Sequence, residues 1–422
     1  MMRILWATPF NVKSAIARYS RLVTDEIAAR GHTVELLRLE DKATSTLDIL
    51  DSELTVHAAD TLKPARLRGY DVCVVNFGDY LSFHAGALAL ASSVPAVAVL
   101  HDANMENFLL EAFQAYPGLA ALLEAWPPAS LALPEGRTPG QRAISFLAAI
   151  SSGCVVHGPH YVEDVVAACP GPTVQLPLCY PEIGAVSPEP EVSDAFVVMC
   201  FGMINRNKQP ERILRALAIH PALRARGRVR FVGPIEDGYR KNLAAHAARL
   251  GLAEPDFTGW VDDAQLCRLL AQAHLLCCLR HPIAEGGSAS LITALYSGRP
   301  VVVNDAGSYA AIPDGLVYKI SADEDPAPLA TVMADVAGSP LAAEAAARAA
   351  AFARRHYAAD TYVDGLIPLL EAALANRPEL EAARGMGRRL HSLGLTFADG
   401  TAAGLENRLA CVRRSPAPLT QT

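Results

Sequence analysis

Short apolar runs alternate with longer amphipathic stretches along most of the chain. Residues 3–7 form the first apolar run, and a helix is predicted over residues 14–30, because apolar side chains recur at helical spacing from Ile16 to Ile27. Gly31 is well placed to end that helix. Further strands are predicted at 33–37, 72–76, 96–100, 153–157 and 174–176. Because these runs are apolar on both faces, they indicate a parallel sheet covered by helices.

The same alternation starts again after a segment rich in proline and acidic residues, residues 180–194, which is the best candidate for a linker. Strands are predicted there at 196–201, 228–232, 274–279, 300–303 and 317–320, followed by alanine-rich helices over 342–375. The predicted fold class is therefore α/β, with two Rossmann-like domains, 1–185 and 195–375, and a cleft between them. Residues 117–141, rich in proline, are expected to form an irregular and mobile loop near the cleft.

Composition narrows the class of protein further. The chain has 422 residues, 51% of them hydrophobic, and a formal net charge of −7, so nothing drives it toward nucleic acid or anionic lipid. Most of the nine cysteines fall inside apolar runs and none forms a CxxC pair, which favours buried thiols and a cytoplasmic location. We expect no signal peptide and no membrane-spanning segment, although peripheral membrane contact stays possible.

The most informative stretch is residues 279–303, LRHPIAEGGSASLITALYSGRPVVV. A strand runs into a loop that carries one carboxylate, Glu285, and two glycines, and an amphipathic helix capped by Ser288 or Ser290 follows. Free backbone N–H groups and the helix dipole make such a helix start a favourable site for a diphosphate. A carboxylate beside it can accept hydrogen bonds from sugar hydroxyls. This combination suggests an enzyme that handles a nucleotide-sugar.

Several common motifs are missing from the sequence. No GxGxxG follows the first strand, no GxxxxGK[ST] occurs, and there is no GxSxG elbow. These absences argue against a dinucleotide oxidoreductase, a P-loop nucleotidase and a serine hydrolase. No convincing pair of carboxylates occurs in a loop, so we expect no bound metal.

Three segments carry a resemblance to a known family: FGMINRNKQPERI (201–213), FTGWVDD (257–263) and EGGSASLITALYSGRPVV (285–302). Together with the two Rossmann-like halves they resemble the family-four retaining glycosyltransferases of GT-B fold, the glycosyl transferases group 1. The resemblance implies an acceptor-side first domain, a donor-binding second domain, and C-terminal helices, about 376–422, that pack back on the first. It also implies transfer of a sugar, most often a hexose, in the biosynthesis of cell-surface glycans or glycoconjugates.

The expected substrates follow from the same resemblance. The donor would be a nucleoside-diphosphate sugar, most often a UDP or GDP sugar, with no other cofactor. The acceptor would be a glycan, a lipid-linked molecule or a small molecule. Neither a nucleic-acid partner nor an oligomeric state is implied.

Family members carry two glutamates eight positions apart in the strand–loop–helix segment. Glu285 matches the first, which reaches the donor sugar, whereas Thr293 stands where a ribose-binding glutamate is expected. The amides around Gly286, Gly287, Ser288 and Ala289 would contact sugar and phosphate.

Cations are expected around the leaving diphosphate, because its charge grows as the glycosidic bond breaks. Lys208 matches the family's lysine, while Met203 occupies the position of its arginine, so that Arg206 and Arg280 are candidates to share the role. Gly233 lies where relatives contact the nucleotide. His101, at the end of an apolar strand in the first domain, would lie near the reacting sugar.

Two other hypotheses stay open at this stage. The missing glutamate, the missing arginine and a first loop without a glycine pair are also compatible with a degenerate GT-B subunit that binds a nucleotide or glycan without transfer. A sugar-nucleotide epimerase or a disaccharide phosphorylase would share the fold. Product analysis separates them, because epimerisation needs no acceptor and phosphorolysis needs phosphate.

Overall fold

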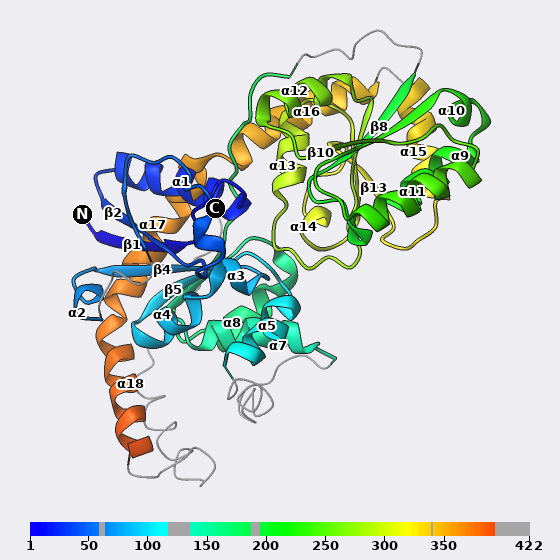
Figure 1. The fold of residues 1–422 in the computed structure, drawn as a ribbon. Helices are drawn as coiled ribbons and strands as arrows, with labels where there is room; N and C mark the ends of the chain where they lie inside the picture. The colour runs from blue at the N-terminus through cyan, green and yellow to red at the C-terminus, as the bar shows by residue number, and fades with distance from the viewer. Residues whose placement is uncertain (59–63, 117–135, 187–194, 339–340, 393–422) are drawn as a thin grey trace.

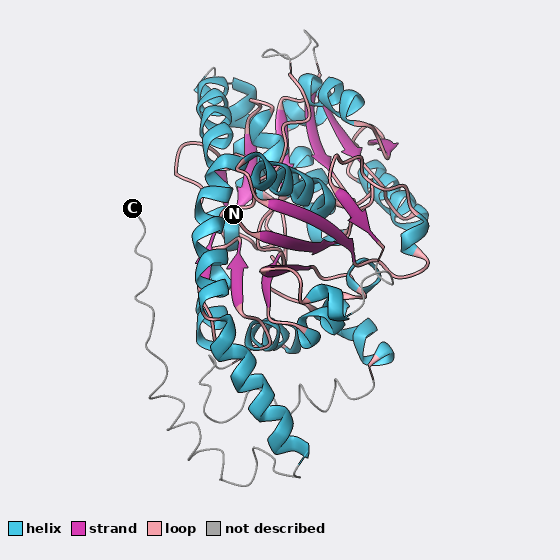
Figure 2. Cartoon of the chain, turned by 90° about the vertical axis from the view of Figure 1, so that its left-hand side faces the viewer, coloured by secondary structure: helices cyan, strands magenta, loops and turns pink. Residues whose placement is uncertain are grey.

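The computed structural model describes residues 1–58, 64–116, 136–186, 195–338 and 341–392. These residues form two lobes, each built on a fully parallel β-sheet, and Figure 1 shows the first lobe in blue and cyan and the second in green and yellow. Helices cover the strands on both sides (Figure 2). The predicted fold class, two Rossmann-like domains with parallel sheets, is confirmed.

The first sheet has seven strands in the order β3-β2-β1-β4-β5-β6-β7. The strands are β1 (Arg3–Thr8), β2 (Thr33–Arg38), β3 (Thr55–His57), β4 (Val72–Phe77), β5 (Ala96–Leu100), β6 (Gly153–Val156) and β7 (Thr173–Gln175). The helices are α1 (Ala15–Ala29), α2 (Pro64–Leu67), α3 (Leu81–His84), α4 (Ala87–Ser93), α5 (Glu106–Ala115), α7 (Pro139–Ala149) and α8 (Val162–Ala168), with short 3-10 turns η1 (Thr44–Thr46) and η2 (Pro159–Tyr161).

Alternate residues of these strands pack into two different cores. Trp6 and Val74 face the core that contains α1, whereas Leu5 and Val75 face the core beneath α4, α5 and α7. This alternation is the pleat of a sheet that is buried on both faces. It explains why the central strands are continuously apolar in sequence, as predicted.

The second sheet has six strands in the order β10-β9-β8-β11-β12-β13. They are β8 (Phe196–Phe201), β9 (Gly227–Val232), β10 (Asp256–Gly259), β11 (Leu275–Cys278), β12 (Val301–Asn304) and β13 (Tyr318–Ile320). The surrounding helices are α9 (Pro210–Ile219), α10 (Pro221–Arg226), α11 (Asp237–Arg249), α12 (Asp263–Gln272), α13 (Ala289–Tyr296), α14 (Gly307–Ala310), α15 (Ala327–Gly338) and α16 (Leu341–His356), with the 3-10 turn η3 (Arg206–Lys208).

The chain returns to the first lobe in α17 (Ala359–Ala375), drawn in orange in Figure 1, and continues in α18 (Arg377–Ser392). The hydroxyl groups of Tyr362 in α17 and Tyr19 in α1 are 2.6 Å apart. Arg377 donates hydrogen bonds to the carbonyl oxygens of Tyr70 and Asp71. The return therefore begins at Ala359, within the range that the sequence assigns to the second domain.

Parts of two segments, the expected irregular loop and the expected linker, lie outside the described residues. Of the expected irregular loop, residues 117–135 lie outside the described residues, and α7 begins at Pro139 with Thr138 as its cap. Thr138 and Gln141 exchange hydrogen bonds as a capping box, which explains a helix start in a proline-rich stretch. Residues 187–194 of the expected linker also lie outside the described part of the chain.

Candidate functional site

The loops that follow β5 and β11 meet between the two lobes. The amide of Ala103 donates a hydrogen bond to the carbonyl oxygen of Ala284 at 2.6 Å, and the amide of Gly286 donates to the carbonyl oxygen of His101 at 2.8 Å. These two bonds form an antiparallel bridge between Asp102 and Glu285. Both loops lie at the carboxyl ends of parallel strands, where ligands bind in this class of sheet.

Gly286 is required by this contact. A Cβ atom at this position would lie 2.1 Å from the Tyr161 hydroxyl oxygen and 2.9 Å from the His101 carbonyl oxygen. Only glycine therefore lets the loop reach the first lobe. The Gly286 amide is also occupied by that contact, so that it is not free to bind a phosphate in this structure, in contrast to the expectation from the sequence.

A cavity of about 220 Å³ opens beside this bridge. From the first lobe it is lined by Ala15, Ile16, Tyr19, His101, Asp102, Leu178 and Tyr180. From the second lobe it is lined by Arg280, Glu285, Gly287, Ser288, Ala289 and Ser290. Its volume is below the roughly 300–1,000 Å³ of a whole small-molecule site. It therefore suits one part of a larger ligand, such as a single sugar unit.

Glu285 is held firmly at one side of this cavity. The guanidinium of Arg280 contacts both of its carboxylate oxygens at 3.2 Å, and Tyr309 of α14 donates a short hydrogen bond to Oε1. Burial would lower the pKa of Arg280, but the Glu285 charge and the Tyr309 contact outweigh it and raise this pKa. Oε2 keeps the capacity to accept a hydroxyl, because a carboxylate has about four acceptor positions.

The N-terminus of α13 lies directly after Glu285. Ser288 caps the helix, since its hydroxyl accepts a hydrogen bond from the Leu291 amide at 3.4 Å. The first intrahelical bond runs from the Ile292 amide to the Ser288 carbonyl oxygen. The amides of Ala289 and Ser290 precede it and have no partner among the described residues, so they are available to an anion.

Lys208, at the end of η3, is 4% exposed. Its ammonium group has no hydrogen bond or ion pair within the described ranges of the chain. It lies against Gly202, because a Cβ on Gly202 would be 3.3 Å from Lys208 Nζ and 3.0 Å from Ser290 Oγ. Burial and the nearby Arg280 guanidinium lower the pKa of this lysine. A largely buried cation without a partner is costly, so an anion at this lysine would be stabilised.

Lys208 and three other predicted residues do not line the cavity. Arg206 is exposed, and its guanidinium stands over the ring of Tyr239 at 5.9 Å. Gly233 packs on Gly202, since a Cβ there would be 2.1 Å from the Gly202 carbonyl oxygen. Thr293 is buried in α13 and does not line the cavity.

His101 lines the cavity, and both of its ring nitrogens are directed at other groups of the protein. Asn76 donates to the Ala7 carbonyl oxygen, so its Oδ1 faces His101 Nε2, 2.9 Å away, and this nitrogen donates. His157 Nδ1 donates to the Leu176 carbonyl oxygen at 3.0 Å, so His157 Nε2 and His101 Nδ1, 3.2 Å apart, both present lone pairs, and no hydrogen bond joins them while both rings are neutral. Burial lowers the pKa of His101 well below its usual value and that of His157 to about 4, which keeps the pair neutral at pH 7.

Four polar residues at this site were not identified from the sequence as site residues: Asn76, Asp102, His157 and Tyr309. Asp102 directly follows the predicted His101 after β5, and Tyr309 follows β12, the strand next to β11 that leads to Glu285. That position was the signal available in the sequence.

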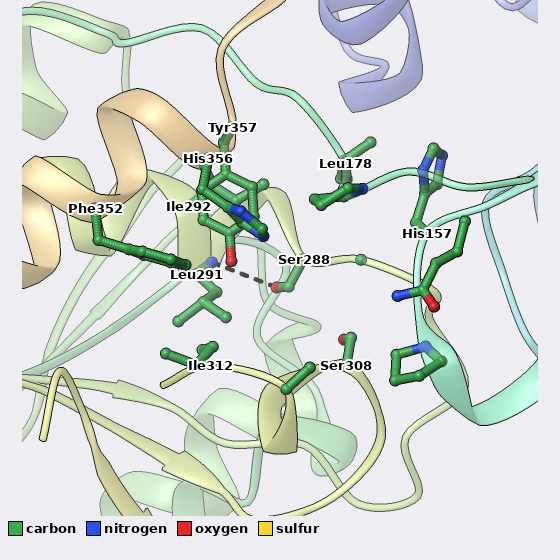
Figure 3. Close-up of a pocket in the computed structure, with 15 residues that line it drawn as sticks. His157, Leu178, Ser288, Leu291, Ile292, Ser308, Ile312, Phe352, His356 and Tyr357 are labelled. Atoms are coloured by element: carbon green, nitrogen blue, oxygen red, sulfur yellow. Dashed lines mark hydrogen bonds between the residues drawn. The ribbon is translucent and has the colours of Figure 1, made fainter. Parts of the chain in front are cut away.

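A second, smaller cavity of about 60 Å³ lies on the other side of the Gly287–Ser288 backbone. Figure 3 shows Ser288 between the two lobes, with its hydroxyl bonded to Leu291, and Phe352, His356 and Tyr357 along one wall. The buried Ser308 hydroxyl at its edge has no hydrogen-bond partner. A space of this size has room for water and for side-chain movement.

The described residues hold neither a cluster of metal ligands nor a helix that could span a membrane. No three or more His, Cys, Asp or Glu side chains are grouped so that they could hold a metal ion. No helix in the described ranges is both long and apolar enough to cross a membrane.

The architecture places the chain among proteins of GT-B fold. The structure of Anabaena HepE in complex with UDP and glucose matches with a TM-score of 0.60 at 18% identity, covering 88% of this chain and 100% of HepE. The structure of TarM matches with a TM-score of 0.63 at 11% identity, covering 88% of this chain and 99% of TarM.

The sequence is similar to one protein family over part of its length. Residues 186–317 match the family described as "Glycosyl transferases group 1", a range that covers most of the second lobe. The D-inositol 3-phosphate glycosyltransferase of Streptomyces scabiei is 32% identical over 295 residues, which is 65% of this chain and 62% of the relative. The chain thus spans somewhat less than two thirds of the length of that curated relative.

Proposed function

We propose that this protein is a retaining glycosyltransferase that moves a sugar from a nucleoside-diphosphate sugar to an acceptor hydroxyl. The observation that carries the proposal is the Lys208 ammonium, on a side chain that is 4% exposed, which has no hydrogen bond or ion pair among the described residues. Gly202 lies close to both this ammonium and the Ser290 hydroxyl at the start of α13, where the amides of Ala289 and Ser290 are free. A cation and a helix start near each other favour a diphosphate. The group 1 family match and the GT-B architecture support the same class of reaction.

In this proposal Glu285 orients the donor sugar. Arg280 and Tyr309 fix its carboxylate at the edge of the cavity, and Oε2 accepts a hydrogen bond from a sugar hydroxyl. Lys208 and the α13 amides stabilise the diphosphate as its negative charge grows. Arg206 and Gly233 lie on the same side of the second lobe and are assigned to the outer part of the nucleotide.

The role of His101 follows from its hydrogen bonds. Because its Nε2 donates to Asn76 and its Nδ1 is directed at His157, it contributes the wall of the cavity rather than a free base. The Glu285 carboxylate is held by Arg280 and Tyr309, so it is not placed as a free nucleophile for a double displacement. We therefore propose that an oxygen of the departing diphosphate takes the acceptor proton, which corresponds to transfer with retention. The donor is proposed to be a UDP or GDP sugar, and HepE, a protein of the same fold, was solved with UDP and glucose.

The test is product analysis with purified full-length protein. UDP and GDP sugars are incubated with and without acceptor alcohols, and products are identified by mass spectrometry, with the anomeric configuration read by NMR. A new glycoside with the donor's configuration supports the proposal. Formation of an epimerised nucleotide-sugar in the absence of acceptor, or release of sugar only when inorganic phosphate is present, would overturn the proposal. A glycoside with the opposite anomeric configuration would overturn the assignment as a retaining enzyme.

A further inference from the structure

We propose that Asp102 binds a hydroxyl of the acceptor and selects an uncharged acceptor over a phosphorylated one. This inference rests on the proposed transferase function and adds the chemistry of the second substrate. Three features of the site support it: the position of Asp102 in the cavity, the hydrogen bonds of its two carboxylate oxygens, and the charge of the wall around it.

Asp102 lies opposite the residues proposed to hold the donor. Its backbone pairs with that of Glu285 in the bridge between the lobes, and both residues line the same cavity. The second lobe supplies Glu285, the α13 amides and Lys208 to the donor. A group that faces them from the first lobe is therefore placed to contact the molecule that attacks the sugar.

The two oxygens of Asp102 are not equivalent. Oδ2 accepts a hydrogen bond from the Asp79 amide at 2.8 Å, which fixes the orientation of the carboxylate. Oδ1 has no hydrogen-bond partner among the residues that the structure describes. The side chain is thus a preoriented hydrogen-bond acceptor with one open position, the arrangement needed to bind a hydroxyl group.

The rest of the first-lobe wall carries no cationic side chain that an anion could bind, because none of the residues that line the cavity from this lobe is a lysine or arginine. The amides of Ala15 and Ile16, at the start of α1, have no partner among the described residues and are the groups of this wall that favour an anion. The His101 ring is neutral, with both nitrogens directed into the protein, and the Tyr19 hydroxyl is paired with Tyr362. A phosphate beside Asp102 would meet the Asp102 charge while the nearby Arg280 is already paired with Glu285, whereas a neutral polyol would gain a charge-assisted hydrogen bond.

Several charged or titratable groups face Asp102. Asp79 from the loop after β4 and Glu285 from the loop after β11 disfavour its ionisation, and Arg280 favours it, while His101 and Tyr161 are the remaining titratable neighbours. Burial is the largest cause and, with these charges, raises the pKa of Asp102 to about 7. The ionised form accepts the stronger hydrogen bond. The acceptor KM should therefore fall as pH rises from about 6 to about 8.

The experiment compares the Asp102→Asn variant with the wild type. The asparagine oxygen can still accept the Asp79 amide, so the fold is retained while the charge is lost. We expect the acceptor KM to rise about tenfold or more and to lose its dependence on pH near 7. Donor KM and the slow hydrolysis of donor without acceptor should stay within about twofold.

Acceptor pairs give a second measurement. Neutral polyols and glycosides are compared with their phosphate monoesters, including inositol and inositol 3-phosphate. The wild type should prefer the neutral member by about tenfold or more, and Asp102→Asn should narrow this preference. Asp79→Asn is the charge control: it removes the negative charge next to Asp102, and because its amide oxygen can accept from only one of the two donors, Asn107 and Phe108, its melting temperature is measured as well. Because it removes a like charge, this variant should shift the pH dependence of the acceptor KM to lower pH. The acceptor KM at pH 8 should be unchanged.

The outcomes are distinct. An unchanged acceptor KM in Asp102→Asn, or a wild-type preference for the phosphate monoesters, overturns the inference while transfer itself stands. A raised donor KM with an unchanged acceptor KM places Asp102 on the donor and also overturns it. Absence of any nucleotide-sugar turnover by the wild type rejects the proposed function, and this inference with it.

Discussion

Tyr309 donates a hydrogen bond to the carboxylate of Glu285, although 24 residues separate them in the sequence. Tyr309 is 1% exposed, and burial together with the Glu285 charge raises its pKa well above the usual value, so it remains a donor at all accessible pH values. The phenol and the Arg280 guanidinium hold Glu285 from two sides. The orientation of the proposed donor-sugar contact therefore depends on a residue of the next loop in the sheet.

Removing this phenol should weaken the reaction without unfolding the protein. A hydrogen bond to a charged group is worth about 1.5–3 kcal/mol, so Tyr309→Phe should lower kcat/KM for the donor by about 10- to 100-fold. Arg280 still compensates the Glu285 charge, so the melting temperature should change little. Steady-state kinetics with varied donor checks this. An unchanged kcat/KM would show that the phenol does not position Glu285.

Replacing Lys208 should raise the stability of the ligand-free protein and lower its activity. Replacing it by methionine keeps most of the buried volume and removes an ammonium without a partner, so Lys208→Met should stabilise the ligand-free protein by about 1–3 kcal/mol. The same change should lower kcat by about 100- to 1,000-fold, the usual cost of removing one donor to a developing anion. Calorimetry and turnover measure both effects.

Arg206→Met is the control for Lys208→Met. Its guanidinium is exposed on the Tyr239 ring, so its loss should change stability by less than about 1 kcal/mol and activity only modestly. If Lys208→Met keeps normal turnover, the diphosphate does not bind at this lysine.

The close approach of the two loops makes a steric prediction at Gly286. An added Cβ would meet the Tyr161 hydroxyl and the His101 carbonyl oxygen, so Gly286→Ala should push the donor loop off the first lobe and lower transfer by about 100-fold or more. Circular dichroism should remain that of a folded protein. Gly385→Ala, where an added Cβ meets nothing within 4 Å, should leave transfer unchanged. Equal activity of the two variants would contradict the role of the bridge.

Buried histidine should make the protein sensitive to acid. Burial lowers the pKa of His84 from 6.5 to about 4, and its ring lies 2.9 Å from the Asn76 carbonyl oxygen. The unfolded state therefore binds a proton at higher pH than the folded state, so the free energy of unfolding falls as pH drops from about 6.5 toward 4. A single such group contributes about 3 kcal/mol across this window.

In His84→Gln the free energy of unfolding, measured by urea titrations at several pH values, should fall less steeply between about pH 6.5 and pH 4. His220→Gln, at an exposed position, should leave the dependence of the free energy of unfolding on pH unchanged. The same slope in His84→Gln and in the wild type would show that other groups control acid unfolding.

The sequence predicts the strands well where burial is complete. The predicted ranges of β5 and β8 agree with the structure at both ends, because continuous apolar runs define a buried parallel strand. The edge strand β3 was not predicted. Its three residues are half-exposed and carry no strong pattern, and they are a strand only because β2 offers them a partner.

Part of the site was predictable for a similar reason. Glu285, Arg280 and Ser288 belong to one strand–loop–helix unit, whose local pattern places them together. Tyr309 and His157 depend instead on the order of strands in the sheets, and His157 is 56 residues from its partner His101. The occupied amide of Gly286 was also beyond prediction, because it depends on how closely the two lobes approach.

The central claim is that a buried cation in the second lobe receives the diphosphate of a nucleotide-sugar. The most direct measurement is the acceptor-dependent release of nucleoside diphosphate from a panel of UDP and GDP sugars, by the wild type and by Lys208→Met. The account predicts release together with a glycosylated acceptor in the wild type, and a loss of about 100-fold or more in a variant that is at least as stable. No release by folded wild type from any donor, or equal release by both proteins, would contradict it.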